Sequence, residues 1–215
     1  MISNRAGLLQ KRGVNEKVLA VPVASIRDSL KHGFFTADQS DLIGAIGRLA
    51  VFLDRPLAEQ DPSHKQIIPY FSVVRGDRVL AYRRTTKAGE SRLHNKFSIG
   101  FGGHINDGDV SGAARTNLIL TALVRELNEE VYLPGIQRVS IVGFINDDSN
   151  PVGQVHLGVA CVVELANDHF SVNEPDLIEA AWYRPEEIER LAPSLETWSQ
   201  LLWSQYLSLQ PAMAG

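Results

Sequence analysis

The chain has 215 residues, enough for one sizeable hydrophobic core and a small appendage. Hydrophobic residues make up 44% and charged residues 21%, as in an ordinary soluble domain, and the formal net charge of −4 argues against the basic surface of a nucleic-acid-binding protein. The apolar stretches fall short of the ~20 residues that span a bilayer, and residues 1–13 lack the apolar segment of a secretory signal. We therefore expect a cytoplasmic protein without a membrane partner.

The first 65 residues form an N-terminal extension whose role the sequence does not indicate. A strand is predicted over residues 18–23, and helices are predicted over residues 25–31 and 38–53. Asp61-Pro62-Ser63 is typical of a turn and marks the expected boundary. The chain thus divides into an extension, residues 1–65, and a main domain, residues 66–215.

The main domain begins with a predicted β-hairpin, in which strands over residues 67–74 and 79–83 flank a turn with Gly76 and Asp77. The elements predicted after it are strands over residues 97–105, 139–145, 154–164 and 180–183, and helices over residues 117–131, 185–191 and 194–209. Strands interleaved with a few helices predict an α/β (α+β) sandwich.

The helix predicted over residues 117–131 has two distinct faces. Apolar side chains recur at helical spacing and predict one buried stripe, made of Leu120, Leu123, Val124, Leu127 and Val131. Glu126, Glu129 and Glu130 stand at i, i+3 and i+4, so we expect them to share a surface away from that stripe. Carboxylates so placed repel one another by ~0.2–0.5 kcal/mol per pair. Most acidic helix faces are simply solvated, but this one has the oxygen ligands that Mg²⁺ prefers.

Neighbouring residues strengthen the metal-site hypothesis. Arg125 lies four residues before Glu129 and can pair with that carboxylate and orient it. Upstream of the helix, Gly100, Gly102 and Gly103 would let a phosphate or a metal ion approach the backbone closely.

These residues together resemble the box of the Nudix hydrolases, the MutT-like diphosphate hydrolases, written G-x5-E-x7-R-E-U-x-E-E-x-G-U with U a bulky apolar residue. Arg125 to Glu130 match the catalytic helix of the box, Leu133 matches its last apolar position, and Gly102-Gly103 match its opening glycines. The resemblance covers residues 66–209. It implies a Nudix α/β/α sandwich with a mixed central sheet, preceded here by the N-terminal extension.

The box departs from the family pattern at three points. Asp109 stands where a glutamate is expected after Gly103, and fifteen residues rather than seven then precede Arg125, which indicates an eight-residue insertion. Counting back from Arg125 instead places Asn117 at the glutamate position. Tyr132 replaces the glycine that follows the glutamates. These departures leave the role of the first acidic position open.

The resemblance also implies roles for individual residues. The groups that would bind Mg²⁺ or Mn²⁺ are Glu126, Glu129, Glu130 and the carbonyl of Gly103. Arg125 belongs with the catalytic residues, and Glu129 is our first choice for the group that polarises water. Glu179 and Glu174 are later candidates for the general base, although an ordinary surface role is favoured for each.

Residues 75–96 are locally basic and would attract an anionic substrate. Arg83 and Arg84 end a strand that leads towards the box, so both are predicted to contact phosphate. The other predicted substrate contacts are Gly102, Gly103 and His104. His104 and His156 are each open to two roles, hydrogen bonding to a phosphate or a structural role.

The leading functional prediction is a Mg²⁺-dependent pyrophosphohydrolase acting on a nucleoside diphosphate linked to another group. Its partners would be that small molecule and, because relatives often dimerise, a second copy of the chain. One alternative is a non-catalytic nucleotide sensor with the same fold. Another is an isopentenyl diphosphate isomerase, which uses a cysteine. The single cysteine, Cys161, lies in an apolar run that favours a buried, unreactive thiol, so the isomerase is disfavoured.

Overall fold

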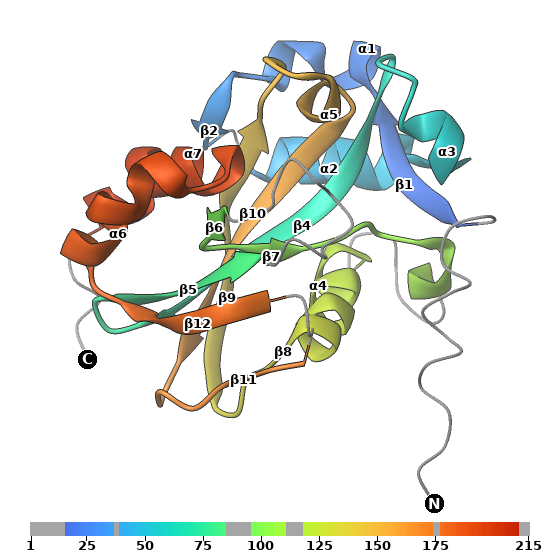
Figure 1. Cartoon of the computed structure of the whole chain (residues 1–215). Coiled ribbons are helices and arrows are strands. Elements are labelled where there is room, and N and C mark those ends of the chain that lie inside the picture. Colours follow the sequence, from blue (N-terminus) through green and yellow to red (C-terminus); the bar gives the residue numbers. More distant parts are fainter. Residues whose placement is uncertain (1–15, 37–38, 85–95, 111–117, 174–176, 211–215) are drawn as a thin grey trace, which may run out of the picture.

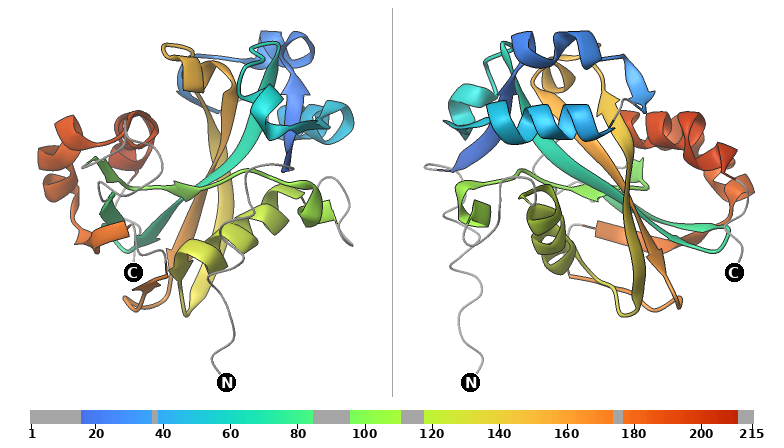
Figure 2. Two further views of the ribbon diagram at one scale, coloured as in Figure 1. Left: turned by 45° about the vertical axis from the view of Figure 1, so that its right-hand side comes forward. Right: turned by 180° about the vertical axis from the view of Figure 1, so that it is seen from behind.

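A computed structural model of the chain describes residues 16–36, 39–84, 96–110, 118–173 and 177–210. Figure 1 shows a strongly twisted mixed sheet, with strands in the order β12-β5-β4-β10-β9-β2 and with β1 beside β4. Figure 2 shows α6 and α7 on one face of this sheet and α4 on the other. The class predicted from the sequence, an α+β sandwich around a mixed sheet, is confirmed.

The centre of the sheet is a parallel pair, β4 (His64–Arg75) and β10 (His156–Leu165). On one side, β10 pairs antiparallel with β9 (Ile136–Asn146). On the other side, β4 turns through Gly76, at φ +58°, into β5 (Arg78–Arg84), as predicted for the hairpin. β12 (Leu177–Tyr183) then pairs antiparallel with β5.

The N-terminal segment contributes strands to the same sheet. Its elements are β1 (Lys17–Pro22), α1 (Val23–Ile26), η2 (Arg27–Ser29), β2 (Gly33–Phe35), α2 (Gln39–Leu49), β3 (Val51–Asp54) and α3 (Arg55–Ala58). β1 pairs with β3 and β4, while β2 pairs with β9. The helix predicted to reach residue 53 ends at Leu49 instead, because β3 takes the following residues into the sheet. Leu19, Leu42 and Ile46 are buried in the core that also receives α4.

The strand predicted over residues 97–105 is broken into β6 (Phe97–Ser98), which pairs with β5, and β7 (Phe101–Gly102), which pairs with β4. Gly100 lies between them, and a Cβ atom there would stand 2.1 Å from the ring of Tyr70, so the backbone crosses that ring only with glycine. A short 3₁₀ helix, η4 (Asp107–Val110), follows.

α4 (Leu118–Glu130) buries a different face from the one expected from its sequence, as if the helix were rotated about its axis. Its buried apolar residues are Leu118, Ile119, Ala122, Leu123 and Leu127, whereas Leu120 and Val124 are 43% and 54% exposed. The prediction that these two belong to the buried face was wrong. The rotation turns Glu126 inward, where it is only 9% exposed, so the glutamates do not all lie away from the core.

After α4, β8 (Val131–Tyr132) pairs with β11 (Ser171–Val172), and α5 (Pro151–Gln154) precedes β10. α6 (Pro185–Leu191) lies where it was predicted. The long helix predicted over residues 194–209 is instead η6 (Ala192–Ser194), α7 (Thr197–Gln205) and η7 (Leu207–Leu209). No helix in the described ranges is long and apolar enough to cross a membrane.

Candidate active site

The site is built where the loop after β7 passes the inner face of α4. A Cβ atom on Gly103 would lie 2.4–2.6 Å from the carboxylate atoms of Glu126. The carboxylate of Glu126 therefore rests directly against the backbone of the loop, and any side chain at position 103 would push it away. This contact explains in physical terms why the box opens with a glycine.

Arg125 joins the loop to the helix. Its Nε and Nη2 atoms donate to Asp109 at 2.8 and 3.0 Å, and Nη2 also donates to the backbone carbonyl of His104 at 2.8 Å. Nη1 donates to Glu126 at 2.6 Å and lies 3.4 Å from Glu129. Burial alone would lower the pKa of this guanidinium, but its hydrogen bonds to Asp109 and Glu126 raise the pKa overall, so Arg125 remains charged.

Asp109 is one of the two residues considered for the first acidic position of the box, and it contacts Arg125. Its side chain is buried, binds Arg125 through both oxygens and accepts a hydrogen bond from the backbone nitrogen of Asn106 at 2.9 Å. The alternative, Asn117, lies outside the described residues. Asp109 and Arg125 thus contact each other although fifteen residues separate them in the sequence.

The acidic groups gather at the carboxyl end of α4. Glu126 is buried, Glu129 is about one-third exposed at its side chain, and Glu130 ends the helix. The last turn of α4 contains no basic residue. Negative side chains at this end of a helix face the negative end of its dipole, an arrangement that costs about 0.3–1 kcal/mol per charge unless a cation offsets it.

Comparison with known proteins agrees with this geometry. The family model described as the NUDIX domain matches residues 68–202. The chain belongs to the Nudix family. Protein YmaB of Bacillus subtilis (strain 168) is 36% identical to it over 200 residues, which span 88% of this chain and 96% of YmaB. The crystal structure of Tm1382, assigned to the Nudix hydrolases, superposes with a TM-score of 0.78 at 32% identity and covers 91% of this chain and all of Tm1382. The chain is a Nudix-type pyrophosphohydrolase, as its box predicted.

Two other predicted site residues of this Nudix domain contact each other. Arg83 donates to the carboxylate of Glu179 through Nε at 2.8 Å and Nη2 at 2.5 Å. The hydrogen bond from Arg83 lowers the pKa of Glu179, and the same bond raises the pKa of Arg83. Glu179 has φ +55°, an unusual value for a residue with a side chain, and it lies at an irregularity in the β12–β5 pairing. The side chain of Arg84 and the residue Glu174 lie outside the described part of the chain.

The two histidines considered as phosphate contacts also lie together, next to the Nudix box. The Nε2 atoms of His104 and His156 are 3.2 Å apart, and both face Oε1 of Glu59, at 3.7 and 3.9 Å. Burial, and then the charges of Arg55 and Arg125 and the ring of His156, keep the pKa of His104 well below its ordinary value, so this imidazole is neutral. Local sequence patterns did not indicate Glu59, because it lies 45 positions before His104 and outside the box.

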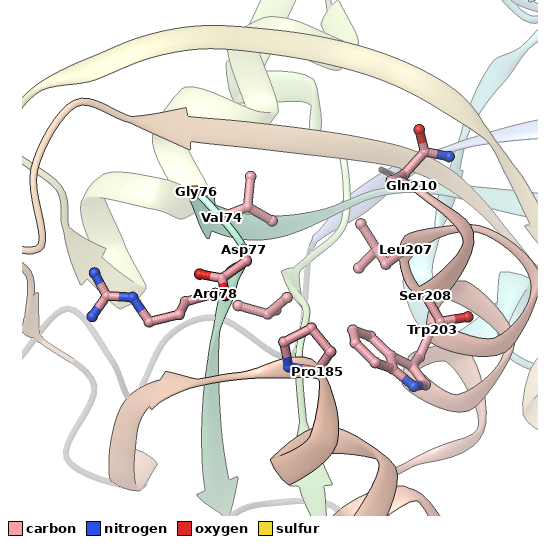
Figure 3. Close-up of a pocket in the computed structure, with 10 residues that line it drawn as sticks. Val74, Gly76, Asp77, Arg78, Pro185, Trp203, Leu207, Ser208 and Gln210 are labelled. Atoms are coloured by element: carbon pink, nitrogen blue, oxygen red, sulfur yellow. The ribbon is translucent and has the colours of Figure 1, made fainter. Parts of the chain in front are cut away.

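A separate pocket lies between the β4–β5 turn and the C-terminal helices (Figure 3). Its walls include Val74, Pro185, Trp203 and Leu207. It contains none of the box residues, and its apolar walls do not suit a charged diphosphate.

Proposed function

We propose that the chain hydrolyses the diphosphate bond of a nucleoside diphosphate linked to another group, with Mg²⁺ or Mn²⁺ as its cofactor. The observation that carries the proposal is the network around Arg125, which fixes the carboxylate of Glu126 against Gly103 and reaches Glu129. The groups that would bind the metal are Glu126, Glu129, Glu130 and the carbonyl of Gly103.

The donor set suits a hard divalent cation for two reasons. All its ligand atoms are oxygens, which Mg²⁺ and Mn²⁺ prefer over nitrogen or sulfur. Three acidic side chains, Asp109, Glu126 and Glu129, contact the guanidinium of Arg125, and Glu130 adds a further negative charge at the unfavourable end of the α4 dipole. When bound, the metal would neutralise phosphate charge and lower the pKa of a coordinated water.

The protein's own residues would position the reactants. Arg125 holds Glu126 and Glu129 in fixed orientations, and Asp109 holds Arg125. Glu129, the more exposed of the two glutamates, is our candidate for orienting and deprotonating the attacking water. Arg83 would contact the substrate phosphate by exchanging its partner Glu179, and the released Glu179 would then be available as a base.

The test is a panel of nucleoside diphosphate derivatives with Mg²⁺, comparing the wild type with Glu130→Gln and with the control Glu186→Gln, whose side chain is exposed in the first turn of α6. We expect Glu130→Gln to lose at least ~10-fold in kcat, since even the supporting residues of a metal site typically contribute ~10–100-fold, and the control to match the wild type. Equal turnover in all three proteins would remove the assigned role of Glu130. Nucleotide-induced thermal stabilisation without turnover of any substrate would favour a sensor instead.

A further inference from the structure

The cluster of Glu59, His104 and His156 lies outside the box carboxylates and is drawn from three distant parts of the chain. Glu59 caps the C-terminal end of α3 in the N-terminal segment, His104 directly follows the box glycine, and His156 begins β10. We propose that these three side chains form a second metal site, which binds a divalent transition metal such as Zn²⁺ and is distinct from the oxygen-only site of the Nudix box.

The geometry of the three ligand atoms fits a metal of this class. Nε2 of His104, Nε2 of His156 and Oε1 of Glu59 form a triangle with sides of 3.2, 3.7 and 3.9 Å. The circumradius of that triangle is about 2.1 Å, so one point lies at the usual zinc–nitrogen and zinc–oxygen bond length from all three atoms. Tetrahedral ligands at that bond length stand about 3.4 Å apart, so binding would require shifts of only a few tenths of an ångström.

His156 is already held in the form that binds metal. Its Nδ1 atom lies 2.7 Å from the backbone carbonyl of Val152, and because a carbonyl can only accept, Nδ1 carries the proton. The Nε2 atom, which faces the other two ligand atoms, is therefore the ring nitrogen that would bind a metal ion. A hydrogen bond from the second ring nitrogen to a carbonyl is the usual outer-shell support of a metal-binding histidine.

A buried amide beside the cluster points to a further polar group. Gln66 is opposite His156 in the parallel β4–β10 register, so the two side chains emerge on the same face of the sheet. Gln66 is fully buried, and neither polar atom of its amide has a hydrogen-bond partner among the described residues. Buried amides rarely remain unsatisfied. A water molecule in the open fourth position of a three-ligand site would supply a partner there.

The ligand chemistry separates this site from the box. Two imidazoles and one carboxylate favour Zn²⁺ and related transition metals, whereas Mg²⁺ prefers oxygen alone. Arg55 is the competing partner of Glu59, with Nε 3.5 Å from the same Oε1 atom, but its shorter contact is to Glu16 at 2.8 Å. Since Glu59 comes from the N-terminal segment, a metal here would tie that segment to the loop of the box.

The test uses the full chain, stripped of metal with a chelator and titrated with Co²⁺ and Zn²⁺. Co²⁺ reports nitrogen ligation in a tetrahedral site through its visible absorption, and calorimetry gives the affinity for Zn²⁺. We expect one equivalent to bind in the presence of excess Mg²⁺. Glu59→Gln and His156→Ala should each weaken binding by at least ~10-fold, the lower end of the loss typical even of residues that only support a metal ligand. The matched controls are His169→Ala, at an exposed histidine outside the cluster, and Glu130→Gln, which alters only the box.

The outcomes separate this site from the proposed function. Binding that survives Glu130→Gln and is lost in Glu59→Gln supports the second site, whether or not any diphosphate is hydrolysed. Wild-type protein that binds neither ion, or binding that is unchanged in both Glu59→Gln and His156→Ala, would overturn it. Because Glu59 is exposed, we expect Glu59→Gln to fold. Its metal binding therefore tests the site even if replacing the buried His156 prevents folding.

Discussion

The Nudix box and the cluster of Glu59, His104 and His156 differ in how many charged side chains they contain and in how those charges are paired. In the box, Asp109, Glu126 and Glu129 surround one guanidinium, and excess negative charge stands at a helix end. In the histidine cluster, a neutral His104 and its partner His156 meet a single carboxylate. The two are connected through the loop itself, since Gly103 contacts Glu126 while the carbonyl of His104 binds Arg125.

This contrast indicates that two groups of side chains next to the same loop are held in place by different interactions. The carboxylates of the box repel one another. The buried ion pair Asp109–Arg125 offsets this repulsion and holds the side chains in position without a metal ion. The histidine cluster carries little charge, and the backbone carbonyl of Val152 orients its His156 ring. Substitutions that remove the ion pair, the close approach at Gly103 or the excess charge should consequently have effects of different size.

The largest effect is expected for Arg125→Met, which leaves the carboxylates of Asp109 and Glu126 buried without their main donor. Breaking a buried pair on one side typically costs 3–5 kcal/mol, so we expect the free energy of unfolding to fall by about 3 kcal/mol. Hydrolysis should be lost as well. Urea unfolding followed by circular dichroism measures the change in stability.

The matched control is Arg83→Met, which breaks the solvent-exposed pair with Glu179. Water screens such pairs, so its loss of stability should be far smaller. If both variants lost the same stability, the Asp109–Arg125 pair would not be the organising contact of the box.

The next largest effect is expected for Gly103→Ala, whose Cβ would meet the Glu126 carboxylate at 2.4 Å. Displacing a catalytic group by about 1 Å can cost ~100-fold in rate, and we expect a loss of that size in kcat with little change in fold. Gly108→Ala is the control, because its Cβ would meet only the side-chain oxygen of Asn106, at 3.1 Å. Wild-type turnover by Gly103→Ala would show that the contact with Glu126 is not needed.

The same contrast explains what the sequence could predict. Arg125, Glu126, Glu129 and Glu130 lie within six residues, so helical spacing alone brings them together, and the strong hairpin and α6 were also predicted with nearly correct bounds. The pairing of Arg83 with Glu179 and the approach of Glu59 to His104 depend on tertiary packing, which local spacing does not encode. The rotation of α4 was mispredicted because Leu120 and Val124 fit the helical period yet face outward.

A smaller effect, of opposite sign, is expected for Glu130→Gln without metal. Removing a negative charge from the C-terminal end of α4 should raise the free energy of unfolding by about 0.3–1 kcal/mol. Adding Mg²⁺ should then stabilise the wild type more than the variant, since a ligand stabilises the folded state that binds it. Differential scanning fluorimetry with and without Mg²⁺ measures both changes. A variant less stable than the wild type without metal would show that Glu130 has a structural role.

The smallest effect on turnover is expected at Cys161, which belongs to neither cluster. Burial raises the pKa of its thiol from 9.0 to about 12, which reduces the thiolate roughly a thousandfold relative to an exposed cysteine. Native protein should therefore resist alkylation until it unfolds, and Cys161→Ala should hydrolyse diphosphates within about twofold of the wild type. Loss of activity in this variant would support the alternative hypothesis of a cysteine-dependent reaction such as isomerisation.

The raised pKa of Cys161 also fixes the sign of a pH effect. Well below pH 9 the thiol is protonated in both the folded and unfolded chains, so it adds no pH dependence to stability there. As the pH rises towards 12, the unfolded chain loses its proton first and the folded state loses stability relative to it. Cys161→Ala should thus lose less stability than the wild type between pH 8 and about pH 10, measured by chemical unfolding. Identical pH profiles for the two proteins would mean that the thiol is not buried as described.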